Sequence, residues 1–179
     1  MKRVVVTGGS GKLGDAVVAD LVASGWDVLN VDLVPPSVRR CSFLKADLVD
    51  FGQVVEALVG ADAVVHLAAI PAPGLSTDAV TFENNTVSTY NVFAAARTLG
   101  LRNIVWASSE TVLGLPFSTP PPYVPVDEEY PGRPESSYSL SKLLGEQMAV
   151  QFCRQDPTLK IYGLRFSNVM RISDYAEFP

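Results

Sequence analysis

Short runs rich in valine and other β-branched residues alternate along this chain with longer amphipathic stretches. Six of these runs have the composition of buried strands: Arg3–Val6, Asp27–Val31, Ser42–Lys45, Ala63–Leu67, Asn103–Ala107 and Lys160–Leu164. Four intervening stretches have helical periodicity, and glycines close the first three: Lys12–Ser24, Phe51–Val59, Asp78–Leu99 and Ser136–Cys153. The alternation is typical of βα units, so it predicts an α/β fold with a doubly wound parallel sheet of about six strands.

One segment interrupts this alternation. The proline-rich stretch Leu115–Pro134 predicts a long loop ahead of the last helix, where it would form one wall of a site. The chain has 179 residues, the size of one ordinary domain. Its 47% hydrophobic and 18% charged residues indicate a folded globular protein.

Charge and hydropathy exclude two classes of partner. The net charge is −5, and no basic run is longer than Arg39–Arg40, so nucleic-acid binding is disfavoured. The longest apolar stretches, such as Ala63–Ile70, are far shorter than the roughly 20 residues of a membrane helix. The N-terminus runs straight into a glycine-rich loop, which favours a cytoplasmic protein. Cys41 and Cys153 lack metal-like spacing, so we expect reduced core cysteines and no metal site.

A glycine-rich loop follows the first predicted strand and opens the first predicted helix. It reads Thr7-Gly8-Gly9-Ser10-Gly11-Lys12-Leu13-Gly14. Gly8, Gly11 and Gly14 would permit a tight turn, close approach of a pyrophosphate, and packing of helix on strand. A structural turn without a ligand is the alternative, but the strand–loop–helix context favours dinucleotide binding at the helix N-terminus.

An acidic residue ends the second predicted strand. Asp32 lies close to the offset of about 20 residues at which a carboxylate reaches the ribose 2′-hydroxyl of a dinucleotide. A carboxylate repels a 2′-phosphate, so NAD is favoured over NADP as the cofactor. A solvated Asp32 at the strand end is the alternative interpretation.

Tyr138 and Lys142 are four residues apart on a predicted helix and therefore share one face. A phenol with a pKa of about 10 is a poor base at neutral pH unless a nearby cation, such as Lys142, lowers that pKa. Such a pair is common on helices by chance. Ser108 and Ser109 follow a predicted strand at its carboxyl end, where open α/β sheets bind ligands. We therefore predict Ser109, Tyr138 and Lys142 as a catalytic set, with Ser108 open to a role in the turn.

These motifs together resemble the extended short-chain dehydrogenases, the NAD-dependent epimerase/dehydratase family, over nearly the whole chain. Thr7–Gly14 is similar to the family's Thr-Gly-x-x-Gly-x-x-Gly, and His66–Ala69 is similar to its His-Leu-Ala-Ala. Asn85, Thr89 and Asn91 look like its Asn-x-x-x-Thr-x-Asn, and Arg165–Val169 resembles its Arg-x-x-Asn-Val. The resemblance implies a Rossmann fold that binds NAD.

The resemblance also implies roles for single residues. Asn85 is similar to the asparagine that orders a water by the active-site lysine, and so joins the catalytic candidates. The substrate-contacting candidates are Ser109, Glu110 and Asn168. The expected cofactor contacts are Gly8, Gly11, Lys12, Leu13, Gly14, Asp32, Asp47, Leu48, Leu67, Ala68, Ala69, Tyr138, Lys142 and Phe166.

The chain departs from the family pattern at three places. Leu113 replaces the usual tyrosine before Gly114, and Ser109-Glu110-Thr111 lacks the Thr-Asp-Glu of the sugar 4,6-dehydratases, although Glu110 could supply one acid. The chain stops at Pro179, whereas family members continue into a smaller lobe that closes over the sugar. We therefore expect residues 1–179 to be an NAD-binding Rossmann domain, truncated so that the C-terminal substrate lobe is absent.

Two functions from different classes fit these features. The first is an enzyme that moves hydride between nicotinamide and a hydroxyl- or carbonyl-bearing carbon of a sugar or nucleotide-sugar, by oxidation, reduction or epimerisation. The second is an NAD-binding sensor or scaffold without turnover. The intact Tyr138 and Lys142 favour the enzyme. Its expected partner is a small sugar-like substrate, and a homodimer is left open.

Overall fold

A computed structural model describes residues 2–177 and contains a six-stranded parallel sheet in the order β3-β2-β1-β4-β5-β6. The strands are β1 Arg3–Thr7, β2 Asp27–Asp32, β3 Ser42–Lys45, β4 Ala63–His66, β5 Asn103–Ser109 and β6 Lys160–Phe166. The order reverses between β1 and β4, which makes this pair the topological switch point of the sheet. The doubly wound Rossmann fold is confirmed.

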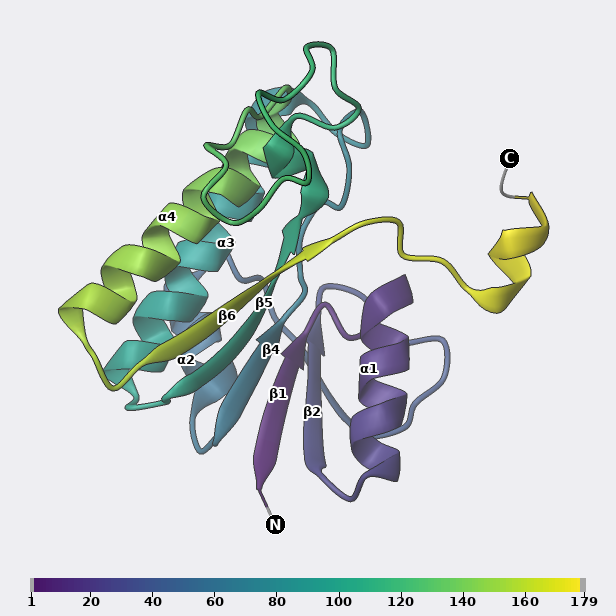
Figure 1. The fold of residues 1–179 in the computed structure, drawn as a ribbon. Helices are drawn as coiled ribbons and strands as arrows, with labels where there is room; N and C mark the ends of the chain where they lie inside the picture. Colours follow the sequence, from purple (N-terminus) through teal and green to yellow (C-terminus); the bar gives the residue numbers. More distant parts are fainter. Residues whose placement is uncertain (1, 178–179) are drawn as a thin grey trace.

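Helices cover the two faces of the sheet unequally (Figure 1). Helix α1 (Lys12–Ala23) lies alone on one face. Three helices share the other face: α2 (Phe51–Leu58), α3 (Asp78–Thr98) and α4 (Ser137–Gln155). This follows from right-handed crossovers, because the chain moves one way across the sheet from β1 to β2 and the other way from β3 onward.

The two faces have cores of different size. Among the described residues, nineteen buried side chains form the core that α2, α3 and α4 cover, with Phe93, Trp106 and Phe152 at its centre. Beneath α1, only Val4, Val6, Val18 and Val28 are buried in one cluster. Beyond that cluster, an apolar groove of about 410 Å³ runs between α1 and strands β4, β5 and β6.

The predicted elements differ from the observed ones mainly at their ends. Strands β1, β2, β5 and β6 each extend one or two residues further toward their carboxyl ends than predicted, and β4 ends at His66, one residue earlier. Two short 3-10 helices were not predicted: η1 (Glu110–Leu113) and η2 (Ile172–Glu177). Residues 114–136 form a long loop without helix or strand, as expected, and Figure 1 shows it beside the first turns of α4.

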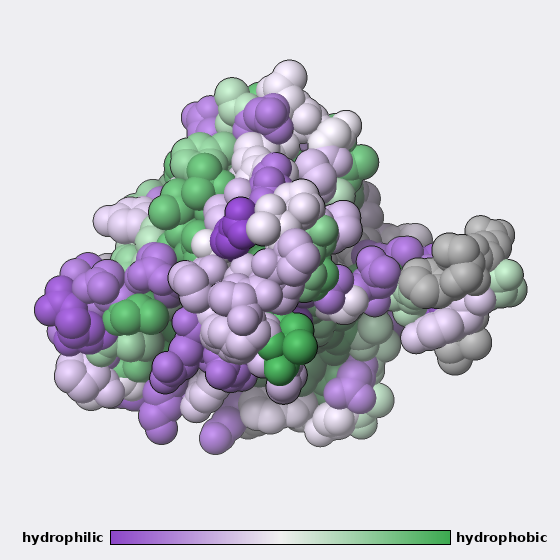
Figure 2. Space-filling model, turned by 45° about the horizontal axis from the view of Figure 1, so that its top comes forward, coloured by the Kyte–Doolittle hydropathy of each residue, from purple (hydrophilic) through white to green (hydrophobic). Residues whose placement is uncertain are grey.

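No helix in the described part of the chain is long and apolar enough to cross a membrane. Hydrophilic and hydrophobic side chains are intermixed on the face turned forward in Figure 2.

Candidate active site

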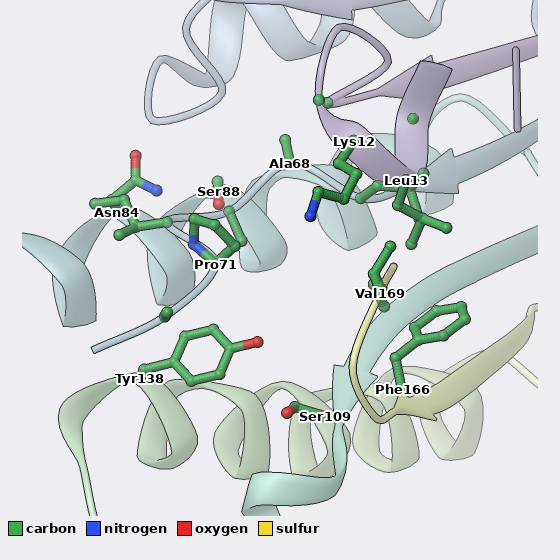
Figure 3. Close-up of a pocket in the computed structure, with 18 of the residues that line it drawn as sticks. Lys12, Leu13, Ala68, Pro71, Asn84, Ser88, Ser109, Tyr138, Phe166 and Val169 are labelled. Atoms are coloured by element: carbon green, nitrogen blue, oxygen red, sulfur yellow. The ribbon is translucent and has the colours of Figure 1, made fainter. Parts of the chain in front are cut away.

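A cavity of about 740 Å³ opens at the carboxyl ends of the strands. Parallel sheets bind ligands at this edge, because the loops that leave the strands gather there. Figure 3 shows the side chains that line the cavity coming from the phosphate loop, the segment after β4, α3, α4 and the end of β6. All but one of the predicted site residues line it: Gly8, Gly11, Lys12, Leu13, Gly14, Asp32, Asp47, Leu48, Leu67, Ala68, Ala69, Ser109, Glu110, Tyr138, Lys142, Phe166 and Asn168.

The glycine-rich loop packs tightly against the segment that follows β4. Gly8 has a φ of +71°, and a Cβ there would lie 2.6 Å from the backbone nitrogen of Ala68. A Cβ at Gly14 would overlap the Gly8 carbonyl oxygen. A Cβ at Gly11, the N-cap of α1, would lie 3.3 Å from the Gly8 carbonyl oxygen, a tight contact, and this cap receives no side-chain hydrogen bond within the described residues. The loop is therefore rigid, and the first amides of α1 remain available to an anion.

Asp32 lines the cavity and also fixes the phosphate loop. Its carboxylate accepts hydrogen bonds from the backbone N–H groups of Ser10 at 3.1 Å and Val34 at 3.3 Å. Beside Asp32, the Asn30 amide donates to the Ser10 hydroxyl at 3.2 Å. The acidic group is thus held at the mouth of the glycine loop, where a ribose attached to a loop-bound pyrophosphate would lie.

Lys142 is buried in the second turn of α4, only 4% exposed. Its ammonium donates to the Ala107 carbonyl at 2.8 Å and lies 5.3 Å from the centroid of the Trp106 ring and 5.7 Å from that of Tyr138. Burial lowers the pKa of Lys142 to about 8. At pH 7 the protonated form still exceeds the neutral form by about ten to one. A cation therefore sits beneath the phenol ring.

Tyr138 is one helical turn earlier, and its hydroxyl points into the cavity (Figure 3). Burial raises the pKa of this phenol, and the smaller effect of the Ser109 hydroxyl lowers it. Burial dominates the pKa of the phenol in this structure, in which the Lys142 ammonium donates to the Ala107 carbonyl. That Lys142 lowers the pKa of Tyr138 during the reaction stays a prediction. Tyr138 is thus protonated here, as a proton donor requires.

Thr111 is a site residue that the sequence did not single out. It lines the cavity, and both its backbone N–H and its hydroxyl donate to the Ser109 hydroxyl oxygen, at 3.2 Å and 3.0 Å. These bonds exist because Ser109 is the N-cap of η1. The available signal was a hydroxyl residue two positions after a candidate serine.

Asn85 is the predicted residue that does not line the cavity. It is 2% exposed, and its side-chain amide accepts from the Ile70 N–H at 2.8 Å and donates to the Ile70 carbonyl at 3.0 Å. Its neighbour Asn84 lines the cavity instead. Asn85 therefore anchors the segment after β4, and the water-ordering role that the resemblance implied stays a prediction.

His66 is fully buried and contacts two threonines. Its Nδ1 lies 2.7 Å from the Thr7 hydroxyl and its Nε2 lies 3.3 Å from that of Thr89. Burial, with a smaller effect of the Lys142 charge, lowers the pKa of His66 to about 3. This neutral imidazole joins the ends of β1 and β4 to α3 and serves the framework of the site.

Known proteins with the same arrangement identify the family. The model of the NAD dependent epimerase/dehydratase family matches residues 4–174. The chain therefore belongs to the NAD dependent epimerase/dehydratase family, as the sequence motifs predicted, and its homologues are enzymes.

Individual relatives are similar over almost all of this chain. UDP-glucose 4-epimerase 2 of Oryza sativa subsp. japonica is 30% identical over 94% of the chain and 45% of its own length. L-arabinose 1-dehydrogenase (NAD(P)(+)) of Haloferax volcanii is 32% identical over 99% of the chain and 71% of its length. A short-chain dehydrogenase/reductase superfamily protein from Agrobacterium tumefaciens, solved with NAD, has a TM-score of 0.82 at 34% identity, covering 93% of this chain and 49% of that one. The chain thus spans about half the length of the rice and Agrobacterium proteins.

Proposed function

We propose that this protein binds NAD and transfers hydride between the nicotinamide and a hydroxyl- or carbonyl-bearing carbon of a sugar or nucleotide-sugar. One observation carries the proposal: a single cavity brings the phosphate loop of α1 together with the hydroxyls of Ser109 and Tyr138 and the ammonium of Lys142. A dinucleotide site and an acid/base group within one cavity are what this reaction requires.

The residues present fit the dinucleotide. The cavity volume of about 740 Å³ lies within the range of about 300–1,000 Å³ that ligand pockets occupy. The phosphate loop would hold the pyrophosphate, Asp32 the adenosine ribose, and Asp47 and Leu48 the adenine side. Leu67, Ala68, Ala69 and Phe166 would line the rest of the cofactor. When bound, NAD supplies the hydride acceptor or donor at its nicotinamide.

Tyr138 would move the proton of the reacting hydroxyl. Its phenol faces the cavity beside the Ser109 hydroxyl, which would hold the same substrate oxygen. The Lys142 ammonium beneath the ring would stabilise the phenolate while the proton is on the substrate. Glu110 and Asn168 line the same cavity and would contact the substrate.

A sugar-like substrate is supported by the relatives, two of which are named as a UDP-glucose epimerase and an L-arabinose dehydrogenase. We propose in addition that residues 1–179 are the dinucleotide-binding domain. Further substrate contacts would then lie in the part of the relatives that this chain does not span.

The competing function, an NAD sensor or scaffold without turnover, needs neither a phenol nor an ammonium at the carboxyl edge of the sheet. Both groups are in place here, Lys142 at the cost of burying a charge. A panel of free aldoses, uronic acids and UDP-sugars separates the possibilities. Growth of absorbance at 340 nm indicates net oxidation, and interconversion of UDP-sugars without such growth indicates epimerisation. Tight NAD binding with neither result across the panel, in a protein that also carries the part of the relatives that this chain does not span, would refute the proposed enzyme.

A further inference from the structure

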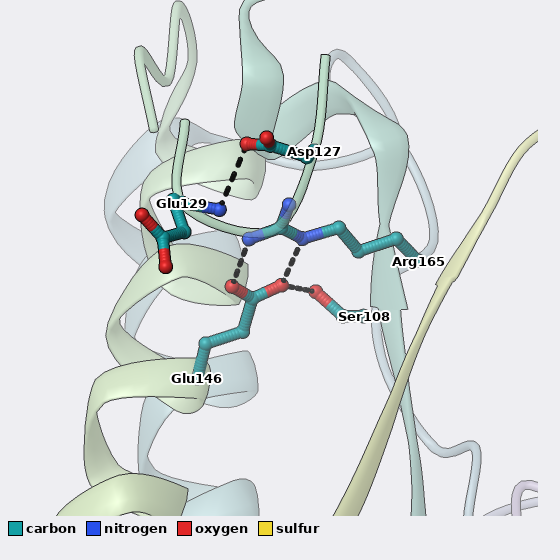
Figure 4. A network of polar contacts seen from close by, with 5 residues as sticks. All are labelled: Ser108, Asp127, Glu129, Glu146 and Arg165. Carbon is teal, nitrogen blue, oxygen red and sulfur yellow. Dashed lines mark hydrogen bonds and ion pairs between the residues drawn. The ribbon is translucent and has the colours of Figure 1, made fainter. Parts of the chain in front are cut away.

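A carboxylate on α4 joins three elements next to the candidate site (Figure 4). Glu146 Oε1 accepts from the Ser108 hydroxyl at 2.6 Å and from Arg165 Nε at 2.9 Å, and its Oε2 accepts from an Arg165 terminal nitrogen at 2.8 Å. Bidentate arginine–carboxylate pairs are geometrically specific as well as strong. The side chains of Arg165 and Glu146 are 25% and 18% exposed, so water screens this pair only in part.

The strand register places this cluster at the edge of the cavity, which Ser108 also lines. Ser108 on β5 is paired with Arg165 on β6, so both side chains lie on the same face of the sheet, toward α4. The next pair in the register is Ser109 with Phe166, and both of these residues line the cavity. Glu146 therefore binds both residues of the strand pair that directly precedes Ser109 and Phe166.

The three last residues of β5 are each tied to α4. The Ala107 carbonyl accepts from Lys142, the Ser108 hydroxyl donates to Glu146, and the Ser109 hydroxyl faces the Tyr138 phenol. The outer two ties involve the groups that would do the chemistry. The middle tie, through Ser108 and Glu146, touches neither phenol nor cavity ammonium. It joins the strand end to the helix.

We propose that Glu146 is a positioning residue, whose bonds to Ser108 and Arg165 set the placement of the Ser109 hydroxyl and the Ala107 carbonyl relative to Tyr138 and Lys142. This inference rests on the proposed function for its kinetic consequence, but its structural consequence is independent of any substrate. Misplacement of a reacting group by about 1 Å can cost about 100-fold in rate. Three hydrogen bonds from Ser108 and Arg165 to Glu146 limit such movement of the strand ends.

The charge state of the cluster suits this role. Burial by itself would raise the pKa of Glu146, but hydrogen bonds from Arg165 and Ser108 outweigh it and the pKa is lowered. The same pairing raises the pKa of Arg165. The carboxylate and guanidinium therefore stay ionised throughout the range in which the site would work, and the bonds to Glu146 do not weaken with moderate changes of pH.

The test compares Glu146→Gln and Ser108→Ala, with Asp15→Asn as the control. Asp15 forms an ion pair with Arg40 at 3.5 Å, away from the cavity, so its loss removes a comparable contact without touching the site. The first readout is the pKa of Tyr138 in the absence of substrate, from tyrosinate absorbance at 295 nm. Because the chain has six tyrosines, the titration of the same protein carrying Tyr138→Phe is subtracted from each titration, and circular dichroism reports the fold at each pH.

Loss of the bonds to Glu146 should raise the Tyr138 pKa in both test variants, because Ser109 is the group that lowers it. A purely electrostatic effect would act differently: Glu146→Gln leaves the Arg165 cation unpaired and would lower the phenol pKa, while the neutral change Ser108→Ala would leave it unaltered. That pattern, or an unchanged Tyr138 pKa in both variants, would overturn the proposal. Asp15→Asn should titrate like the wild type.

The second readout is kinetic, with any substrate that the sugar panel yields. Both test variants should lose at least about tenfold in kcat while the KM for NAD stays within about twofold, since the phosphate loop and Asp32 are untouched. A loss confined to NAD affinity would contradict positioning. A raised Tyr138 pKa together with no turnover of any sugar, in a protein that also carries the part of the relatives that this chain does not span, would leave the role of Glu146 standing and refute the proposed function instead. Ser108→Ala removes one hydroxyl only, so it serves if Glu146→Gln does not fold.

Discussion

Replacing Lys142 with methionine is predicted to stabilise the folded protein while removing the cation beneath Tyr138. The ammonium is 4% exposed, and burial lowers its pKa from 10.5 to about 8. A difference of this size corresponds to a destabilisation of the folded state by about 3 kcal/mol wherever the lysine is charged in both states. Methionine has similar length and no charge, so it relieves most of that cost.

The expected gain depends on pH in a defined direction. Below pH 8 both the folded and the unfolded chain hold the proton, and the full cost of about 3 kcal/mol applies. Between about pH 8 and 10.5 the unfolded chain holds a proton that the folded protein has lost, so wild-type stability rises with pH. At pH 9.5 about 1 kcal/mol of the cost remains. Loss of the bond to the Ala107 carbonyl offsets the gain by about 1 kcal/mol.

Urea unfolding of wild type and Lys142→Met, without NAD, measures this difference. At pH 7 the variant should be more stable by about 2 kcal/mol, and at pH 9.5 the two proteins should be nearly equal. Other groups titrate alike in both proteins and cancel in the comparison. The reasoning is refuted if the variant is less stable at pH 7, or if the gap is the same at both pH values. The same variant should bind NAD more weakly and lose turnover.

Three further predictions concern the cofactor, the acid/base group and the packing of α4. NAD should bind more tightly than NADP, and Asp32→Ala should reduce the difference between the two affinities. Calorimetric titrations that show equal affinity in the wild type would mean that Asp32 does not contact the ribose. Tyr138→Phe should abolish turnover and change NAD affinity by only a few fold, and ordinary activity in that variant would exclude the phenol from the chemistry. Gly145→Ala would place a Cβ 2.5 Å from the Trp106 ring, so it should destabilise the folded protein by about 1–3 kcal/mol although alanine has the better helix propensity. The midpoint of urea unfolding should fall accordingly. A midpoint at or above the wild-type value would mean that the ring shifts freely.

Much of the fold could be predicted because periodicity and glycine placement are local signals. Runs such as Val4–Val6 indicate buried strands, and glycines at positive φ close α1, α2 and α3. The ends of the strands were predicted less accurately, because hydrogen bonding with the neighbouring strand determines where each strand ends. Ser108 and Ser109 belong to β5 because they pair with Arg165 and Phe166, which are 57 residues further along the chain.

The candidate site was predictable where spacing alone brings groups together. Tyr138 and Lys142 share a helical face, and the glycine loop is continuous in sequence. The catalytic role of Asn85 came from the family resemblance and stays a prediction. Helical neighbours point about 100° apart, and of this pair it is Asn84 that lines the cavity. Glu146 was missed because its partners come from two other elements. Only the register between β5 and β6 places Ser108 and Arg165 together beneath it.

The unequal coverage of the sheet has a consequence for local opening. The core beneath α1 has four fully buried valines with partly buried apolar residues around them, whereas nineteen buried residues form the core of the other face. The free energy needed to lift α1 should therefore be well below that of global unfolding, and its amides should exchange with solvent sooner than those of α3. Because the N-terminus of α1 is also where the pyrophosphate would bind, bound cofactor would stabilise this helix against local opening. Slower amide exchange along α1 would then report cofactor occupancy directly, without any turnover.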